Sequence, residues 1–303
     1  MKRVVALVLV LLWAVVPQVL ADSYFGDYDS RRDLGDSNSH QDLGTYKIGQ
    51  KQWELIPEYS SYKYEEPSLM ETSGHFTGFS LSYASALPQD WAIRCEGKYS
   101  KGSLDYSSNG TGSQKDITDI MAEIRAIVQL RMDSHKGFFH YGPYLGLGYR
   151  YLNDDSSGWP TDTGYWGYER ESNYYYFPLG GEVGIKPVKT IECSLGAEYD
   201  YLLWGVQKTH LSDVPSPYYD TVLTDITNRQ KKGYGYKFYL RFLVKAADLD
   251  FICEPFFKYW AIKESAEADI YLRSSDGSEY LIGSGVEPEN NTREIGLRLG
   301  VRF

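Results

Sequence analysis

Residues 120–133 read IMAEIRAIVQLRMD, and apolar and polar side chains alternate along the whole stretch. One set is apolar throughout: Ile120, Ala122, Ile124, Ala126, Val128, Leu130 and Met132. Because successive side chains of a strand point to opposite faces, this period of two predicts a strand with one apolar and one largely charged face. These residues would span about 45 Å, a length that fits a tilted strand crossing a membrane better than a strand of a soluble sandwich.

The same alternation recurs in the last segment, Glu294–Phe303, where the apolar face ends on Phe303 itself. Eight further segments alternate less regularly. They predict strands at 52–64, 75–87, 90–102, 138–152, 173–186, 190–206, 234–246 and 248–263. Together with the two clearest segments, the sequence predicts ten strands.

The links between these strands alternate in length. Short links are expected at 88–89, 134–137, 187–188 and 247, and long links at 65–74, 103–117, 153–172, 207–233 and 264–291. Short and long links in turn, with an even number of strands, are typical of outer-membrane barrels. We therefore expect an all-β fold: a transmembrane antiparallel up-and-down β-barrel of about ten strands, with long extracellular loops and short periplasmic turns. Asp276-Gly277 predicts a hairpin within the last long link, between 270 and 283.

The first residues predict export. Lys2 and Arg3 precede an apolar run from Val4 to Leu20, and Ala21 follows as a small residue at a cleavage site. This is the pattern of a cleavable signal peptide over residues 1–21. Residues 22–50 are rich in Asp, Ser and Gly and are expected to form a flexible periplasmic arm, which leaves residues 51–303 for the barrel. The expected location is the outer membrane of a Gram-negative cell.

Charge and hydropathy exclude other classes of protein. The formal net charge is −10 with no basic run, so nucleic acid is not an expected partner. The mean hydropathy of −0.43 is too polar for a bundle of membrane helices. The 28 Tyr and 7 Trp residues suit the aromatic girdles at the two membrane interfaces.

The polar faces of the strands are expected to line the lumen, because a Lys or Arg facing lipid at the bilayer midplane would cost about 2–4 kcal/mol. The predicted lumen charges are Glu58, Arg94, Glu96, Glu123, Arg125, Arg131, Glu182, Glu198, Lys237, Arg241, Glu254, Lys258, Glu294 and Arg298. Two interpretations follow. Interlocked ion pairs could fill a narrow barrel, or the charges could line a selective pore.

The chain resembles the Gram-negative outer-membrane β-barrel class. The C-terminal stretch GLRLGVRF, which ends at Phe303, looks like the signal that the barrel-assembly machinery reads, and Glu254–Trp260 looks like a penultimate strand of porin-like barrels. The resemblance implies as partners the barrel-assembly machinery, outer-membrane lipid and lipopolysaccharide.

Ten strands also resemble the omptin proteases, which place an Asp pair and an Asp-His pair on opposite extracellular rims. The nearest equivalents are Asp116 with Asp119, and His210 with Asp213, although both spacings depart from the omptin pattern. The sequence thus gives weak catalytic candidates, and we expect no enzyme.

The leading functional expectation is a non-enzymatic surface protein whose loops serve envelope integrity, adhesion or the binding of an extracellular ligand. A narrow porin-like channel for small solutes is the alternative, and an omptin-like protease is a third. No cofactor and no metal site are expected. Acidic loop residues, among them Asp154, Asp162, Glu169 and Glu171, could hold divalent cations that bridge lipopolysaccharide, or could form a solvated acidic surface.

Overall fold

The computed structural model describes residues 51–134, 138–216, 218–246 and 249–303. The predicted signal peptide (1–21) and periplasmic arm (22–50) lie outside the described residues, as do parts of the predicted short links at 134–137 and 247. Among the described residues, no helix is long and apolar enough to cross a membrane.

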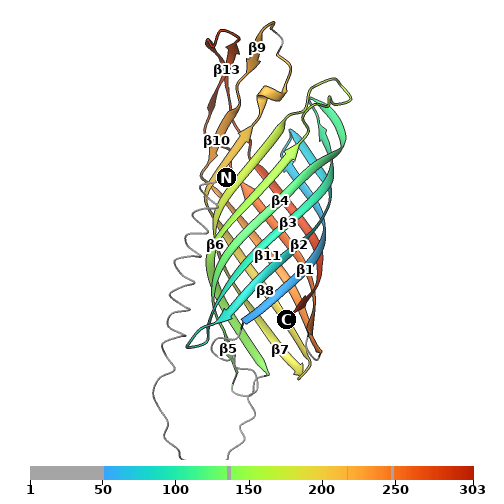
Figure 1. Ribbon diagram of the computed structural model, residues 1–303, viewed down its shortest axis with the longest axis vertical. Coiled ribbons are helices and arrows are strands. Elements are labelled where there is room, and N and C mark those ends of the chain that lie inside the picture. Colours follow the sequence, from blue (N-terminus) through green and yellow to red (C-terminus); the bar gives the residue numbers. More distant parts are fainter. Residues whose placement is uncertain (1–50, 135–137, 217, 247–248) are drawn as a thin grey trace, which may run out of the picture. The chain divides into compact units, whose positions relative to one another are not determined.

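Ten long antiparallel strands form one ring (Figure 1). They are β1 (Lys51–Glu66), β2 (Met70–Ala86), β3 (Trp91–Ser108), β4 (Gly112–Leu130), β6 (Phe139–Asp155), β7 (Glu169–Val188), β8 (Ile191–Thr209), β11 (Gly233–Ala246), β12 (Leu249–Ile262) and β15 (Asn290–Arg302). Each of the ten predicted strands corresponds to one of them. The short strand β5 (Met132–Asp133) continues β4 along β6.

The ring closes where the last strand pairs with the first. Tyr59 of β1 lies opposite Leu297 of β15. At the end of this seam, Trp53 and Phe303 exchange two backbone hydrogen bonds of 2.9 Å. Closure leaves no open edge in the barrel, which satisfies the backbone N–H and C=O groups wherever water is absent. The predicted all-β antiparallel barrel is therefore confirmed.

The strands are longer than predicted on one side of the barrel. The expected long links at 65–74 and 103–117 are mostly strand, because β1 and β2 are separated only by residues 67–69, and β3 and β4 only by 109–111. These extensions were missed because polar residues such as Lys101, Ser103 and Asp105 occupy their outward positions. Without an apolar outer face, the period of two is hard to see in the sequence.

The two longest links carry additional structure at the end of the barrel opposite the C terminus (Figure 1). One contains the 3-10 helix η1 (Leu211–Asp213), β9 (Thr221–Leu223) and β10 (Ile226–Gln230), and β10 pairs with β8. The other contains β13 (Ala268–Ser274) and β14 (Glu279–Gly285), the hairpin predicted from Asp276-Gly277, in which Gly277 has φ +87°. Strand β9 adds to this hairpin to form a separate three-stranded sheet.

The outer wall of the barrel is an apolar band. Aromatic residues at the end that carries the C terminus point outward and are 41–57% exposed: Trp53, Trp91, Phe139, Phe251 and Phe303. Nearer the other end, the outward rings of Tyr149, Tyr175 and Trp204 lie side by side, with centroids 5.1 and 5.6 Å apart. A band of this extent is far larger than the apolar patches of soluble monomers, and aromatic girdles at both ends are what a lipid bilayer covers in barrels.

Candidate functional site

The fourteen charges predicted for the lumen occupy inward positions of their strands. Eight of them are buried: Glu58, Glu123, Arg125, Glu198, Lys237, Glu254, Lys258 and Glu294. The other six are half-buried: Arg94, Glu96, Arg131, Glu182, Arg241 and Arg298. The alternation of each strand places these side chains inside, and closure of the ring brings together charges that are far apart in sequence.

One ion pair crosses the full width of the lumen. Lys258 Nζ lies 2.7 Å from Glu123 Oε2. Their strands, β12 and β4, are five positions apart around the ten-strand ring and are therefore opposite one another. The hydroxyl of Tyr176 on β7 also donates to Glu123. The lumen is thus bridged at mid-height.

Further ion pairs surround this bridge and connect strands that do not pair with each other. Arg125 of β4 makes a two-point contact with Glu198 of β8, with both N···O distances 2.7 Å. Lys98 of β3 lies 2.6 Å from Glu58 and 2.8 Å from Glu294. Because buried charges are tolerated only when they are paired and hydrogen-bonded, the network fits the interpretation of a packed polar core.

On the side of the bridge away from the C terminus, apolar and aromatic side chains fill the interior, whereas the sequence predicted charges there. Met121, Tyr176, Leu202 and Trp260 are at most 1% exposed. The rings of Tyr176 and Trp260 meet edge to face at 5.1 Å. The inward faces of these strands carry both apolar and charged residues, so the sequence pattern did not identify the buried apolar ones. Their burial depends on how the ring closes.

A second bridge crosses the lumen at the end away from the C terminus. We call Tyr64, Glu66, Arg170 and Glu287 the mouth cluster. Arg170 of β7 lies 2.8 Å from Glu66 of β1, on the opposite strand, and 2.5 Å from Glu287, which follows β14. The hydroxyl oxygen of Tyr64 lies 2.9 Å from Glu66 Oε1 and 3.2 Å from Glu287 Oε1, so its single proton can be donated to either carboxylate. None of these four residues was predicted as a site residue, because nothing local in the sequence indicates that they meet.

Two small adjoining cavities remain in the half of the lumen nearer the C terminus. Glu54, Ser82, Arg94 and Arg241 line both of them. The centre of a water molecule can reach about 60 Å³ in one cavity and about 50 Å³ in the other, which is room for a few waters. Charged and polar side chains line much of this part of the lumen, beside a small buried apolar cluster of Ile56, Leu243 and Ile252.

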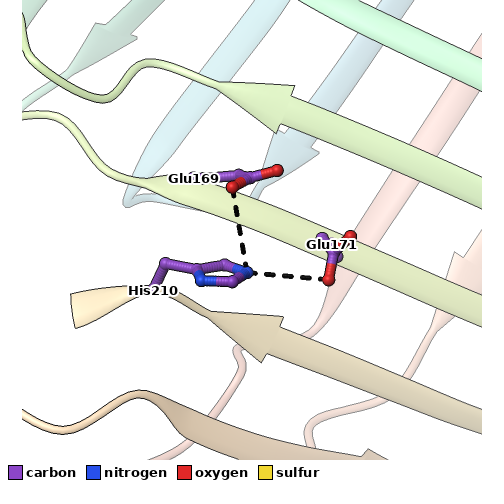
Figure 2. A group of neighbouring side chains, drawn as sticks. All are labelled: Glu169, Glu171 and His210. Atoms are coloured by element: carbon purple, nitrogen blue, oxygen red, sulfur yellow. Dashed lines mark ion pairs between the residues drawn. The ribbon is translucent and has the colours of Figure 1, made fainter. Parts of the chain in front are cut away.

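A group of polar residues lies outside the lumen, on the outer wall. It is farther from the C-terminal end of the barrel than the aromatic side chains of Tyr149, Tyr175 and Trp204. Glu169 and Glu171 flank Arg170, which points into the lumen, so alternation directs both glutamates outward. His210, just after β8, faces them (Figure 2). Its Nε2 lies 3.9 Å from Glu169 Oε2 and 3.6 Å from Glu171 Oε2. We call Glu169, Glu171 and His210 the His210 cluster; its ligating atoms lie within 4.8 Å of one another, which makes it a group that could hold a metal ion.

The other nitrogen of His210 faces a third carboxylate. Nδ1 lies 3.2 Å from Asp225 Oδ2, and Lys208 Nζ lies 3.3 Å from the same oxygen. Burial disfavours the charged form of Asp225, but hydrogen bonds from the backbone and hydroxyl of Ser212 and one from Lys208 outweigh it and hold its pKa below its ordinary value. Asp225 is therefore a carboxylate that holds the His210 ring.

The structure does not assemble the omptin-like candidates into one site. Asp116 is exposed and accepts a hydrogen bond from Ser103, whereas Asp119 is buried. Asp213 accepts from the backbone N–H of Glu169, so the carboxylate at the His210 ring is Asp225 instead. In the described part of the chain, no hydrogen bond or ion pair joins either residue of the first pair to His210 or Asp213.

No family model and no curated protein sequence matches the chain. Solved structures do match it. The outer membrane protease OmpT from Escherichia coli is similar with a TM-score of 0.54 and 10% identity, over 84% of this chain and 96% of that one. The translocator domain of the autotransporter NalP from Neisseria meningitidis follows, with a TM-score of 0.43 and 11% identity, over 86% of this chain and 90% of that one.

The attachment invasion locus protein Ail of Yersinia pestis is also similar, with a TM-score of 0.32 and 10% identity, over 85% of this chain and all of that one. At such low identity, what the match to OmpT shows is the fold. The predicted resemblance is confirmed at that level: this chain has the fold of the outer-membrane β-barrel proteins.

Proposed function

We propose that the protein is a non-enzymatic, non-conducting barrel of the outer membrane that binds an extracellular ligand or surface through the structure built on β9, β13 and β14. The proposal rests above all on one observation: ion pairs between opposite strands cross the lumen at two levels, Lys258–Glu123 and Arg170–Glu66. A lumen closed in this way leaves the outer surfaces to interact with other molecules.

The three-stranded sheet supports a binding role. Strand β14 is an edge of this sheet, and Tyr280, Leu281 and Ile282 on it are 56%, 60% and 52% exposed. Exposed apolar residues on an unpaired strand edge are a common way to bind another protein or a surface. We place this sheet on the extracellular side, because in barrels of this type short turns face the periplasm and long links face outward.

The same fold is the basis for proposing membrane partners. We propose that the outward apolar band contacts outer-membrane lipid, that lipopolysaccharide lies against the upper part of the outer wall, and that the barrel-assembly machinery recognises the strand ending at Phe303. The signal peptide at 1–21 would direct export.

Conductance across a planar bilayer tests the closed lumen. The purified, folded barrel is expected to give no steady openings. A double variant with Glu66→Ala and Arg170→Ala, which removes only the upper bridge, should remain closed because Lys258 and Glu123 still meet below it. Steady openings of nanosiemens size in the unaltered protein would instead favour the narrow channel.

Binding tests the role of the sheet. Replacing residues 269–284 by a short Gly-Ser linker removes β13 and β14 but keeps Ala266, to whose carbonyl Asn228 donates. We expect this variant to fold and to lose binding to host-cell or abiotic surfaces. A matched shortening of the β6–β7 link, at residues 157–167, should keep binding. Unchanged binding after removal of β13 and β14 would contradict the proposal.

The protease alternative has a direct assay. Cleavage of a dibasic fluorogenic peptide by the unaltered protein, lost in His210→Ala, would contradict the non-enzymatic proposal. We expect no cleavage, because His210 is surrounded by Glu169, Glu171 and Asp225 and is not paired with Asp213.

A further inference from the structure

The His210 cluster has the geometry of a metal-binding site. Its three facing atoms are Nε2 of His210 and Oε2 of each glutamate. Nε2 lies 3.6 Å from Oε2 of Glu171 and 3.9 Å from Oε2 of Glu169. Ligands bound about 2.1 Å from one metal ion lie about 3.4–4.2 Å apart as the angle between them opens from tetrahedral to linear. Two of the distances fall in this range, and all three ligating atoms lie within 4.8 Å of one another, so side-chain movements would let one ion contact all three.

Each ligand is held in place by a second residue that binds its other polar atom. The hydroxyl of Tyr151 donates to Glu171 Oε1 at 2.7 Å, and the side-chain amide of Asn153 donates to Glu169 Oε1 at 2.7 Å. These contacts leave Oε2 of each glutamate directed at His210 (Figure 2). Outer partners of this kind orient metal ligands and are typical of metal sites.

The third ligand has such a partner as well. Asp225 Oδ2 lies 3.2 Å from Nδ1 of His210, and Lys208 Nζ lies 3.4 Å from the same nitrogen. Binding of a metal at Nε2 requires the tautomer in which Nδ1–H donates to Asp225 and Nε2 carries the free lone pair. Lys208 pairs with Asp225 and balances its charge. Nε2 itself is shielded from solvent and has no hydrogen-bond partner. A ligand atom that is shielded from solvent, faces two carboxylates and makes no hydrogen bond is a further indication that another group binds there.

Charge and ligand type narrow the choice of ion. With a neutral imidazole, Glu169, Glu171 and Asp225 outweigh Lys208, so a divalent cation would compensate the excess negative charge. Calcium and magnesium prefer oxygen ligands only, whereas an imidazole nitrogen with carboxylates suits zinc and related transition metals.

We propose that Glu169, Glu171 and His210 bind one divalent transition-metal ion, with zinc as the probe, on the outer wall of the barrel. The ion joins the ends of β7 and β8, while Tyr151 and Asn153 tie the site to β6 and Asp225 ties it to the link before β10. It thereby stabilises the part of the barrel that extends beyond the aromatic ring of Tyr149, Tyr175 and Trp204. This inference stands apart from the proposed ligand-binding role of the sheet.

Zinc binding to the refolded full barrel tests the site. After metal removal with a chelator, zinc is titrated in competition with a chromogenic chelator, and one equivalent is expected to bind. Asp225→Asn should weaken zinc binding about 10–100-fold. His210→Ala and Glu171→Gln, which each remove a ligand, should weaken it more. Zinc should also raise the unfolding temperature of the unaltered barrel but not that of these variants.

Matched controls separate the site from general charge effects. His75→Ala removes a histidine on β2, and Glu279→Gln removes an exposed carboxylate on β14; both should bind zinc as the unaltered protein does. Heat-dependent gel migration checks that every variant folds. If His210→Ala does not fold, the conservative Glu171→Gln tests the site instead. Absence of stoichiometric zinc, zinc binding unchanged by Glu171→Gln or His210→Ala, or calcium binding as tight as zinc would overturn the proposal.

Discussion

Lys258 Nζ and Glu123 Oε2 meet at 2.7 Å although β12 and β4 lie on opposite sides of the barrel. Both side chains are buried. A contact between opposite walls is available only where the barrel is narrow enough for two side chains to span it. The pair thus indicates that the lumen is narrow enough for two side chains to span it. Charges on opposite walls can therefore neutralise one another inside the ten-strand ring.

Lys258→Met alone is expected to destabilise the barrel by about 3–5 kcal/mol, because it leaves Glu123 buried without its main counter-charge. Combining it with Glu123→Leu should recover most of that loss. Urea unfolding in lipid vesicles measures both. Lys263→Met is the matched control, since the exposed Lys263–Glu289 pair is expected to contribute little. Equal losses in the single and double variants would contradict this account.

Gly148→Ala is expected to destabilise the barrel by about 1–3 kcal/mol through overpacking. A Cβ at Gly148 would overlap the ring of Tyr176, which lies directly over the glycine inside the lumen. Gly97→Ala is the control, because a Cβ there would meet no atom within 4 Å. The free energies of unfolding of the two variants should differ clearly. A neutral effect of Gly148→Ala would mean that the ring of Tyr176 can move aside.

The mouth cluster predicts a pH dependence. Burial, reinforced by the charge of Glu66 and partly offset by Arg170, raises the pKa of Glu287 above its ordinary value of 4.5. The folded barrel therefore holds a proton that the unfolded chain has released, and this contribution to stability is lost as pH rises from 4.5 through the raised pKa. Glu287→Gln should remove that part of the pH dependence.

Unfolding titrations from pH 4.5 to 8 compare the unaltered barrel with Glu287→Gln. The control is Glu279→Gln, which changes an exposed carboxylate on β14. We expect the slope of stability against pH to become less negative only in Glu287→Gln. Identical slopes in all three proteins would exclude Glu287 as the titrating group.

Phe303→Ala is expected to reduce the amount of folded barrel in cells while leaving the stability of the purified barrel within about 1 kcal/mol. The side chain is 57% exposed, and the seam with Trp53 uses backbone groups that the variant retains. Leu299→Ala, on the same strand and face, is the control, with Leu299 53% exposed. If both variants assemble equally poorly, recognition depends on general strand hydrophobicity and not on the terminal aromatic residue.

Alternation in the sequence was enough to identify the strands whose outer face meets apolar surroundings. In IMAEIRAIVQLRMD, alternation alone gave the strand and the face of each residue, because a strand repeats every two residues and its two faces meet different environments. Where both faces meet polar surroundings, as at Lys101–Asp105, that contrast disappears. The strand extensions there became visible only in the structure.

Which side chains meet across the barrel depends on the folded arrangement of the strands and links. Lys258 and Glu123 are separated along the chain by four of the ten barrel strands, and Arg170 reaches Glu66 and Glu287 only because the ring closes at β1 and β15. Likewise, His210 was paired with Asp213 in the sequence because the two are neighbours, yet the path of the link after β8 brings Asp225 to its ring instead. Local periodicity determines the direction of a side chain, but its partner depends on closure and on loop paths that no local pattern encodes.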